Sequence, residues 1–169
     1  MDPSVVPDLG EAVDMTLRHV ARQFPATFAC ALLPPGTEVS AATWLDTQVT
    51  ARQRRLDCAL DVVANGHRRI EHIEWQLEWD PDLPGRLFEY HVLIALALFG
   101  EVPARHERPP IRTTVVLLSG RKAPWPARGE YRTSPAGEPF TGLVFHIDAV
   151  YQRTVAELKA RASPFWLAF

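Results

Sequence analysis

Cysteines and long apolar runs are scarce in this sequence, and each shortage excludes a class of protein. Only two of the 169 residues are cysteines, Cys30 and Cys58, and no C-x-x-C spacing occurs. This disfavours a disulfide framework or a zinc site and favours reduced, buried thiols, which predicts a cytoplasmic protein. The longest apolar stretch, residues 92–99, is too short to cross a bilayer, and residues 1–8 lack the basic start of a signal peptide. No membrane partner is therefore expected.

The sequence also lacks a large excess of charge of either sign. Its net charge is −2, with 47% hydrophobic and 22% charged residues, which is typical of a folded globular chain and not of a disordered one. The chain as a whole is not an obvious nucleic-acid binder. Residues 105–132, however, carry seven cations against two acids. This local excess fits either a dispersed solvated face or a surface that meets phosphate.

Hydrophobic periodicity predicts a chain order of helix, three strands, helix and strand, followed by an extension. A helical stripe covers residues 11–24 and is expected to end at Pro25. Strands are expected over 43–49, 55–63 and 67–77, and a mostly buried helix runs over 82–100. Residues 113–119 are apolar on both faces of a strand, which predicts a central strand. The Gly- and Pro-rich residues 120–139 predict a loop. A last strand is expected over 143–148 and a last helix over 150–160.

This order predicts an α/β fold in a single domain, residues 1–169, with a core over about 11–119 and an extension over 120–169. Three strands in a meander followed by a helical crossover to a fourth imply a mixed four-stranded sheet flanked by helices. The extension would add a C-terminal strand and helix.

Asn65 and Gly66 form the strongest short hairpin signal in the chain, because both residues tolerate positive φ. If they are the two loop residues, Ala64 faces His67, and the same register brings Asp57 opposite Glu74 with Cβ atoms about 4.5–5.5 Å apart. Two facing carboxylates repel each other. Exposure to water, a raised pKa on one acid or a divalent cation between them would each offset that repulsion.

Alternation along the strands sends Asp57, Glu74 and Gln76 to one face of the sheet, and Trp75 to the other. Magnesium prefers hard oxygen ligands, usually one or two carboxylates with water and a substrate phosphate. The pattern therefore fits a metal site, and it fits an ordinary polar sheet face as well. His72 shares the face of Glu74, as a neighbour of the site or as a structural histidine.

Three segments in this order resemble the recombination-promoting nucleases (Rpn or YhgA-like), some of which are described as transposases. The segments are R-R-L-D-C-A-L-D-V-V at 54–63, H-I-E-W-Q at 72–76 and D-P-D-L-P-G-R-L-F-E-Y at 80–90. This family is a branch of the PD-(D/E)XK nuclease superfamily. The resemblance implies a restriction-endonuclease-like core and a DNA endonuclease, with a link to recombination or mobile elements.

The resemblance also implies roles for individual residues. Asp57 and Glu74, with the backbone carbonyl of Trp75, would bind Mg²⁺ or Mn²⁺. Gln76 stands where the superfamily usually has a lysine, as in many members of this branch that carry E-x-Q. Arg86 and Tyr90 match the R-x-x-x-Y of the following helix and would orient the acids or contact phosphate, although a surface ion pair of Arg86 with Glu89 or Asp82 is the alternative. The opening helix would contribute Asp14, with Arg18 four residues later.

The sequence thus predicts a metal-dependent deoxyribonuclease whose partner is DNA. The alternative is a catalytically degenerate copy of the nuclease fold that binds DNA or protein, and a third is a structural domain with no metal site. A homodimer is compatible with the first, because cutting both strands commonly uses two sites. Trp125, in the loop K-A-P-W-P, could stack on a base or serve in packing.

Overall fold

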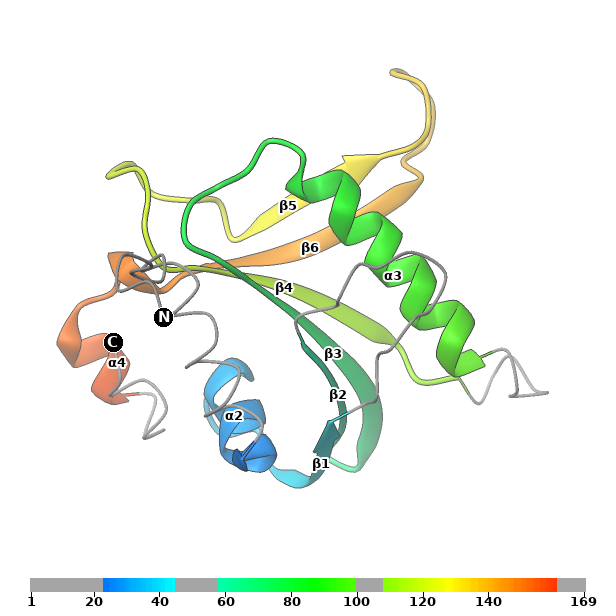
Figure 1. Cartoon of the computed structure of the whole chain (residues 1–169). Helices are drawn as coiled ribbons and strands as arrows, with labels where there is room; N and C mark the ends of the chain where they lie inside the picture. The colour runs from blue at the N-terminus through cyan, green and yellow to red at the C-terminus, as the bar shows by residue number, and fades with distance from the viewer. Residues whose placement is uncertain (1–22, 45–57, 100–107, 161–169) are drawn as a thin grey trace, which may run out of the picture.

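A six-stranded mixed sheet with helices on both faces is the framework of this protein in a computed structural model (Figure 1). The structure describes residues 23–44, 58–99 and 108–160. Across the sheet the strand order is β1-β2-β3-β4-β6-β5. The strands are β1 (Val39–Trp44), β2 (Cys58–Ala64), β3 (His67–Gln76), β4 (Ile111–Leu117), β5 (Arg128–Arg132) and β6 (Gly142–Ala149), and the helices are α2 (Pro25–Leu32), α3 (Leu83–Phe99), the short 3-10 helix η2 (Val150–Gln152) and α4 (Val155–Ala160).

The predicted meander and crossover are both present. Strands β1, β2 and β3 pair in antiparallel order, and α3 then carries the chain to β4, which pairs parallel to β3. The predicted number of four strands is wrong, because the C-terminal extension adds two strands to the same sheet. Strand β6 pairs parallel to β4, and β5 pairs antiparallel to β6 at the edge. The doubly apolar β4 is a central strand, as predicted.

Strand β5 lies inside the segment that was expected to be a loop. Its five residues, R-G-E-Y-R, have no apolar alternation, and four of the five are exposed. An edge strand needs only one hydrogen-bonded neighbour and can be short and charged, which also protects it from aggregation. The pairing of Arg128 with His146 and of Arg132 with Gly142 therefore defines this strand better than its own composition does.

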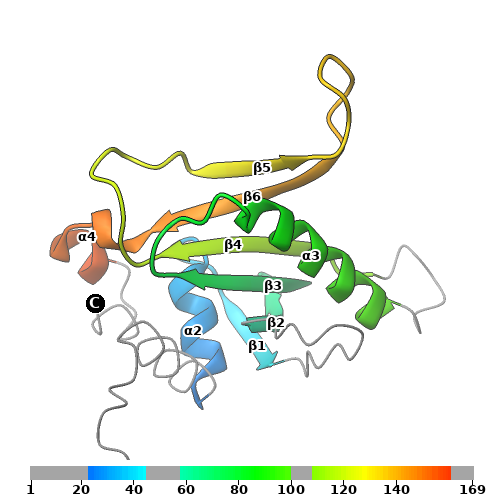
Figure 2. The same cartoon turned by 45° about the horizontal axis from the view of Figure 1, so that its top comes forward.

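Helices α2 and α4 cover one face of the sheet, and α3 covers the other (Figures 1 and 2). Under α2, Phe28 contacts both Trp44 and Trp75, with ring centroids 5.4 and 5.7 Å apart. Under α3, two apolar clusters fill the opposite face, one around Leu87 and Phe145 and the other around Tyr90. Residues on alternate positions of β3 thus belong to two different cores, which explains why so few of them are exposed.

Several helices and strands begin or end at other residues than the sequence predicts, each for a local reason. The sequence predicts that Pro25 ends the 11–24 helix, and in the structure Pro25 is also the first residue of α2. Proline suits the first turn of a helix, and it disfavours helical geometry at the residue before it, here Phe24 (φ −133°, ψ 62°). Most of the predicted 11–24 helix lies outside the described residues. The first strand was predicted over 43–49 and is found at Val39–Trp44, where pairing with β2 fixes it. The last helix is divided into η2 and α4, because Thr154 and Glu157 form a reciprocal cap between them.

Among the helices of the described residues, none has the length and apolar character needed to cross a membrane.

Candidate functional site

The hairpin between β2 and β3 has the register that the sequence predicts. Asn65 and Gly66 are its two loop residues, with φ values of 51° and 75°, and Ala64 faces His67. The same register continues without a shift to Cys58 opposite Ile73. One further step would bring Asp57 opposite Glu74. Asp57 lies outside the described residues, as does Asp14, so this pairing and the role of Asp14 stay predictions.

Glu74 and Gln76 share the face of β3 that packs against α3. On this face Ile70 contacts the α3 core, whereas Ile73 and Trp75 belong to the core under α2, so the predicted alternation is confirmed. Glu74 is 5% exposed. The side-chain amide of Gln76 donates a hydrogen bond to Glu74 Oε1 over 3.3 Å. A buried carboxylate is thus held in orientation by the residue two positions later on the same strand.

His72 lies next to Glu74 on the same face and is completely buried. Its ring meets Tyr90 of α3 edge-on, with centroids 6.0 Å apart, and its Nδ1 lies 3.4 Å from Thr113 Oγ1. Burial, and secondarily His91, lowers the pKa of His72 to about 3. The imidazole is therefore neutral near pH 7, and its 4.0 Å approach to Glu74 Oε2 is not an ion pair.

Lowering the pH from 6 to 4 is expected to remove about 2 kcal/mol of unfolding free energy through His72 alone. An unfolded imidazole takes up its proton near pH 6.5, whereas the folded ring stays neutral down to about 3. The stability is therefore present above the unfolded pKa and is lost as the pH falls. Urea denaturation at both pH values would measure it, with His72→Gln as the variant that should lack this part of the decline. An equal decline in both proteins would contradict the prediction.

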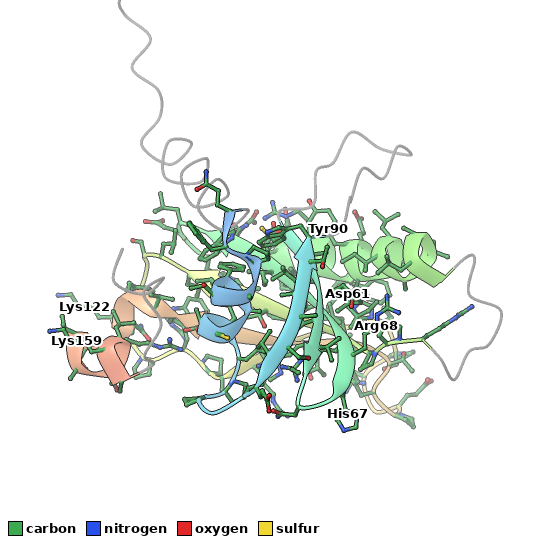
Figure 3. All side chains as sticks on the ribbon, turned by 90° about the horizontal axis from the view of Figure 1, so that it is seen from below. Asp61, His67, Arg68, Tyr90, Lys122 and Lys159 are labelled. Carbon is green, nitrogen blue, oxygen red and sulfur yellow. The ribbon has the colours of Figure 1, made fainter. Side chains whose placement is uncertain are left out.

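Of the two residues predicted on α3, Tyr90 faces the site and Arg86 is held elsewhere. Tyr90 is 7% exposed and packs against His72, as described above; Figure 3 labels it on α3. Arg86 forms an ion pair with Asp80, with Nη1 2.8 Å from Oδ2. The surface ion pair that the sequence offered as an alternative for Arg86 is thus found, but with Asp80 as the partner.

Asp61 lies further along the face that Asp57 is predicted to share, and the hairpin already employs it. Arg68 donates to both of its carboxylate oxygens, with distances of 3.0, 3.0 and 2.7 Å (Figure 3). This ion pair lies near the turn of the hairpin, whereas Glu74 lies near the other end of β3. Within residues 23–44, 58–99 and 108–160, no group of three or more His, Cys, Asp or Glu side chains could hold a metal ion. The predicted metal site at Glu74 includes Asp57, which lies outside these residues.

A second buried acid, Glu71, lies on the opposite face of β3. The sequence predicts no functional or structural role for it. It is 3% exposed, and its oxygens lie 2.7 Å from Arg69 Nε and 3.9 Å from Arg112 Nε. Burial raises the pKa of Glu71, and the two arginines oppose that shift. Strand alternation already placed Glu71 on this face, but Arg112 reaches it only because β3 and β4 pair in parallel with these two residues in register.

The basic segment is distributed over several surfaces. Arg112 is engaged by Glu71, Arg128 lies on β5 opposite His146, and the guanidinium of Arg132 sits 5.2 Å from the centre of the Phe140 ring. Arg105 falls outside the described residues. For this segment the sequence offered either a dispersed solvated face or a surface that meets phosphate. The strand residues Arg112, Arg128 and Arg132 fit the dispersed face, whereas Arg121 lies in the loop between β4 and β5.

Comparisons of the chain with protein-family models, with curated proteins and with solved structures found no match. The resemblance to the recombination-promoting nucleases therefore stays a prediction from the sequence segments at 54–63, 72–76 and 80–90.

Proposed function

We propose that this protein is a metal-dependent endonuclease that hydrolyses phosphodiester bonds of DNA. The observation that carries the proposal is the unbroken β2–β3 register, which reaches Cys58 opposite Ile73 and, continued by one residue, would bring Asp57 opposite the buried Glu74. The order of three meander strands, a helix and a parallel fourth strand supports it, because the nuclease superfamily that the sequence resembles is built in this order.

The chemistry of the donors fits Mg²⁺ or Mn²⁺. Glu74 supplies carboxylate oxygens, Asp57 would supply a second carboxylate, and the Trp75 carbonyl a third oxygen; hard cations prefer such ligands. When bound, the cation would stabilise negative charge on the phosphodiester and lower the pKa of a water. The side chain of Trp75 stays in the core against Phe28, which leaves its backbone as the only part of that residue for the site.

Gln76 would take part by positioning and not by proton transfer. One N–H of its amide is directed to Glu74, so the second N–H and the carbonyl oxygen remain to orient a water molecule. The neutral His72 adds no positive charge beside Glu74, and Tyr90 packs the imidazole in place. The buried surroundings strengthen each electrostatic interaction at this carboxylate.

The alternative is a nuclease fold without catalysis that binds DNA or protein. It is favoured by Gln76, because an amide cannot replace the charge that a lysine would bring to the transition state. Retention of DNA by the purified protein without cleavage in any divalent metal would support this alternative.

Incubation of supercoiled plasmid with the purified protein in Mg²⁺, Mn²⁺ or EDTA tests the proposal. Nicked circles are expected with either metal, and none with EDTA or with a folded Asp57→Ala variant, because removing one carboxylate removes half of the predicted acid pair. Equal cleavage by the variant would refute the assignment of Asp57. The absence of cleavage by the wild-type protein would favour the alternative.

A further inference from the structure

The loop between β4 and β5 is fixed by several hydrogen bonds to η2, the short helix that follows β6. Trp125 Nε1 donates to the Tyr151 hydroxyl over 3.0 Å, and that hydroxyl donates to the Arg121 carbonyl over 2.7 Å. The amide of Gln152 donates to the carbonyls of Arg121 and Ala123, both over 2.9 Å, and its oxygen accepts from the Trp125 backbone N–H. The loop is therefore preorganised around Trp125.

Arg121 is held against this loop, at its surface. Its guanidinium carbon lies 4.0 Å from the centre of the Trp125 ring, and its Nη2 donates to the Pro124 carbonyl over 3.0 Å. Arg121 is exposed and Trp125 is half-buried. A guanidinium fixed in this way presents a planar cationic surface to solvent, and nucleic-acid bases stack on such planes as they do on aromatic rings.

Beneath this pair, aromatic rings continue into the core. Trp125 packs on Trp79 with centroids 5.0 Å apart, and Trp79 stacks on Phe145 at 6.4 Å with a 24° angle between the rings. Phe145 is fully buried. This aromatic ladder, Phe145, Trp79 and Trp125, lies beneath Arg121 and connects it to the buried core.

The aromatic ladder lies at the end of the sheet where the strand of Glu74 and Gln76 finishes. Trp79 follows Gln76 by three residues, and the Leu118 backbone N–H donates to the Gln76 carbonyl over 2.9 Å. Trp79 and Trp125 pack in the core under α3, on the face of β3 that Glu74 occupies. Figures 1 and 2 show the β3–α3 connection and the β4–β5 loop leaving the same end of the sheet.

The charge of this loop matches a phosphate backbone. Residues 119–127 contain two cations, Arg121 and Lys122, and no acid. Figure 3 shows Lys122 projecting outward, at the same end of the molecule as Lys159 of α4.

We propose that Arg121 and Trp125 form a stacking platform for an unpaired base of a DNA strand, with Lys122 facing a neighbouring phosphate. This inference rests on the proposed nuclease function and specifies its substrate class, DNA with a single-stranded or opened segment. In a paired duplex the faces of internal bases are covered by their neighbours, so only an unpaired base can use such a platform.

Binding of a fluorescein-labelled 12-nucleotide single strand in EDTA, followed by anisotropy, tests the platform without cleavage. Tighter binding of the single strand than of a duplex of the same length is expected. Arg121→Gln and Trp125→Leu should each weaken single-strand binding about tenfold, the size of one lost stacking contact. The matched control is Arg132→Gln, which removes another cation from an aromatic ring, Phe140, on the β5–β6 hairpin and should stay within about twofold of wild type.

An abasic strand separates stacking from charge. It should bind wild-type protein about as weakly as the normal strand binds Trp125→Leu, and Trp125→Leu should weaken it no further. Equal wild-type affinity for single strand and duplex would overturn the proposal, and so would equal effects of Arg121→Gln and Arg132→Gln. Because Arg121 is exposed, its variant answers the question even if Trp125→Leu unfolds.

The same measurements keep the two proposals apart. Metal-dependent plasmid cleavage by wild-type protein, together with no preference for the single strand, would refute the platform and leave the nuclease intact. Selective single-strand binding in EDTA, together with no cleavage in any metal, would refute the nuclease and leave the platform as a DNA-binding site.

Discussion

If the protein is the proposed nuclease, replacing Glu74 with glutamine is expected to lower the rate of metal-dependent DNA cleavage roughly a thousandfold, which corresponds to a loss of several kcal/mol of charge stabilisation at the reacting phosphate. The substitution keeps the size of the side chain and an oxygen that can accept from Gln76. It removes the negative charge that a divalent cation requires. Plasmid cleavage with Mg²⁺ and Mn²⁺, compared at equal protein concentration, would measure the loss.

Glu71→Gln is the matched control for this prediction. Glu71 stands on the same strand and is as buried as Glu74, at 3% against 5% exposure, but it faces the opposite side of the sheet. Its neutralisation should lower the melting temperature, because Arg69 and Arg112 lose their shared acid. Cleavage by the folded variant should stay within about twofold of wild type. Equal losses of activity in both variants would assign Glu74 a structural role instead.

The strand face of the candidate site could be predicted from the sequence because one local signal determines it. Asn65 and Gly66 both adopt positive φ, and a two-residue turn of this kind leaves only one register for the strands it joins. Once Ala64 faces His67, the face of every later residue on β3 follows from alternation. The positions of Glu74, Gln76 and His72 on one face, and of Trp75 on the other, therefore required no knowledge of the tertiary structure.

The remaining features depend on contacts between segments that are distant in sequence. Strand β5 has no apolar pattern of its own and is defined by β6. The burial of Glu71 is compensated by Arg112, which the parallel pairing of β3 and β4 brings into register. Trp125 lies in a segment whose composition predicts only a loop, yet it is placed by Tyr151 and Trp79. Composition and periodicity describe one segment at a time, so none of these partners could be identified from them.

Gly129→Ala is expected to destabilise the protein by about 3 kcal/mol and to lower its melting temperature by roughly 6–12 °C. Gly129 lies on β5 directly over the Phe145 ring, so an added Cβ would overlap that ring and also press on Ile147. Phe145 is fully buried and cannot turn into solvent. Any shift of the Phe145 ring alters its stacking on Trp79 and so disturbs the base of the aromatic ladder.

Gly85→Ala is the matched control, because the same chemical change is expected not to lower the melting temperature at this position. Gly85 lies in the first turn of α3, and its added Cβ would meet Tyr131 Cε2 at 3.6 Å, an ordinary contact. Alanine favours a helix over glycine by about 0.5–1 kcal/mol, so this variant should melt at or slightly above the wild-type temperature. Thermal melts followed by near-ultraviolet circular dichroism would report both stability and the packing of Trp79 on Trp125. If Gly129→Ala melted like Gly85→Ala, Phe145 would have room to move, and the aromatic ladder could not be the rigid support that the platform at Arg121 requires.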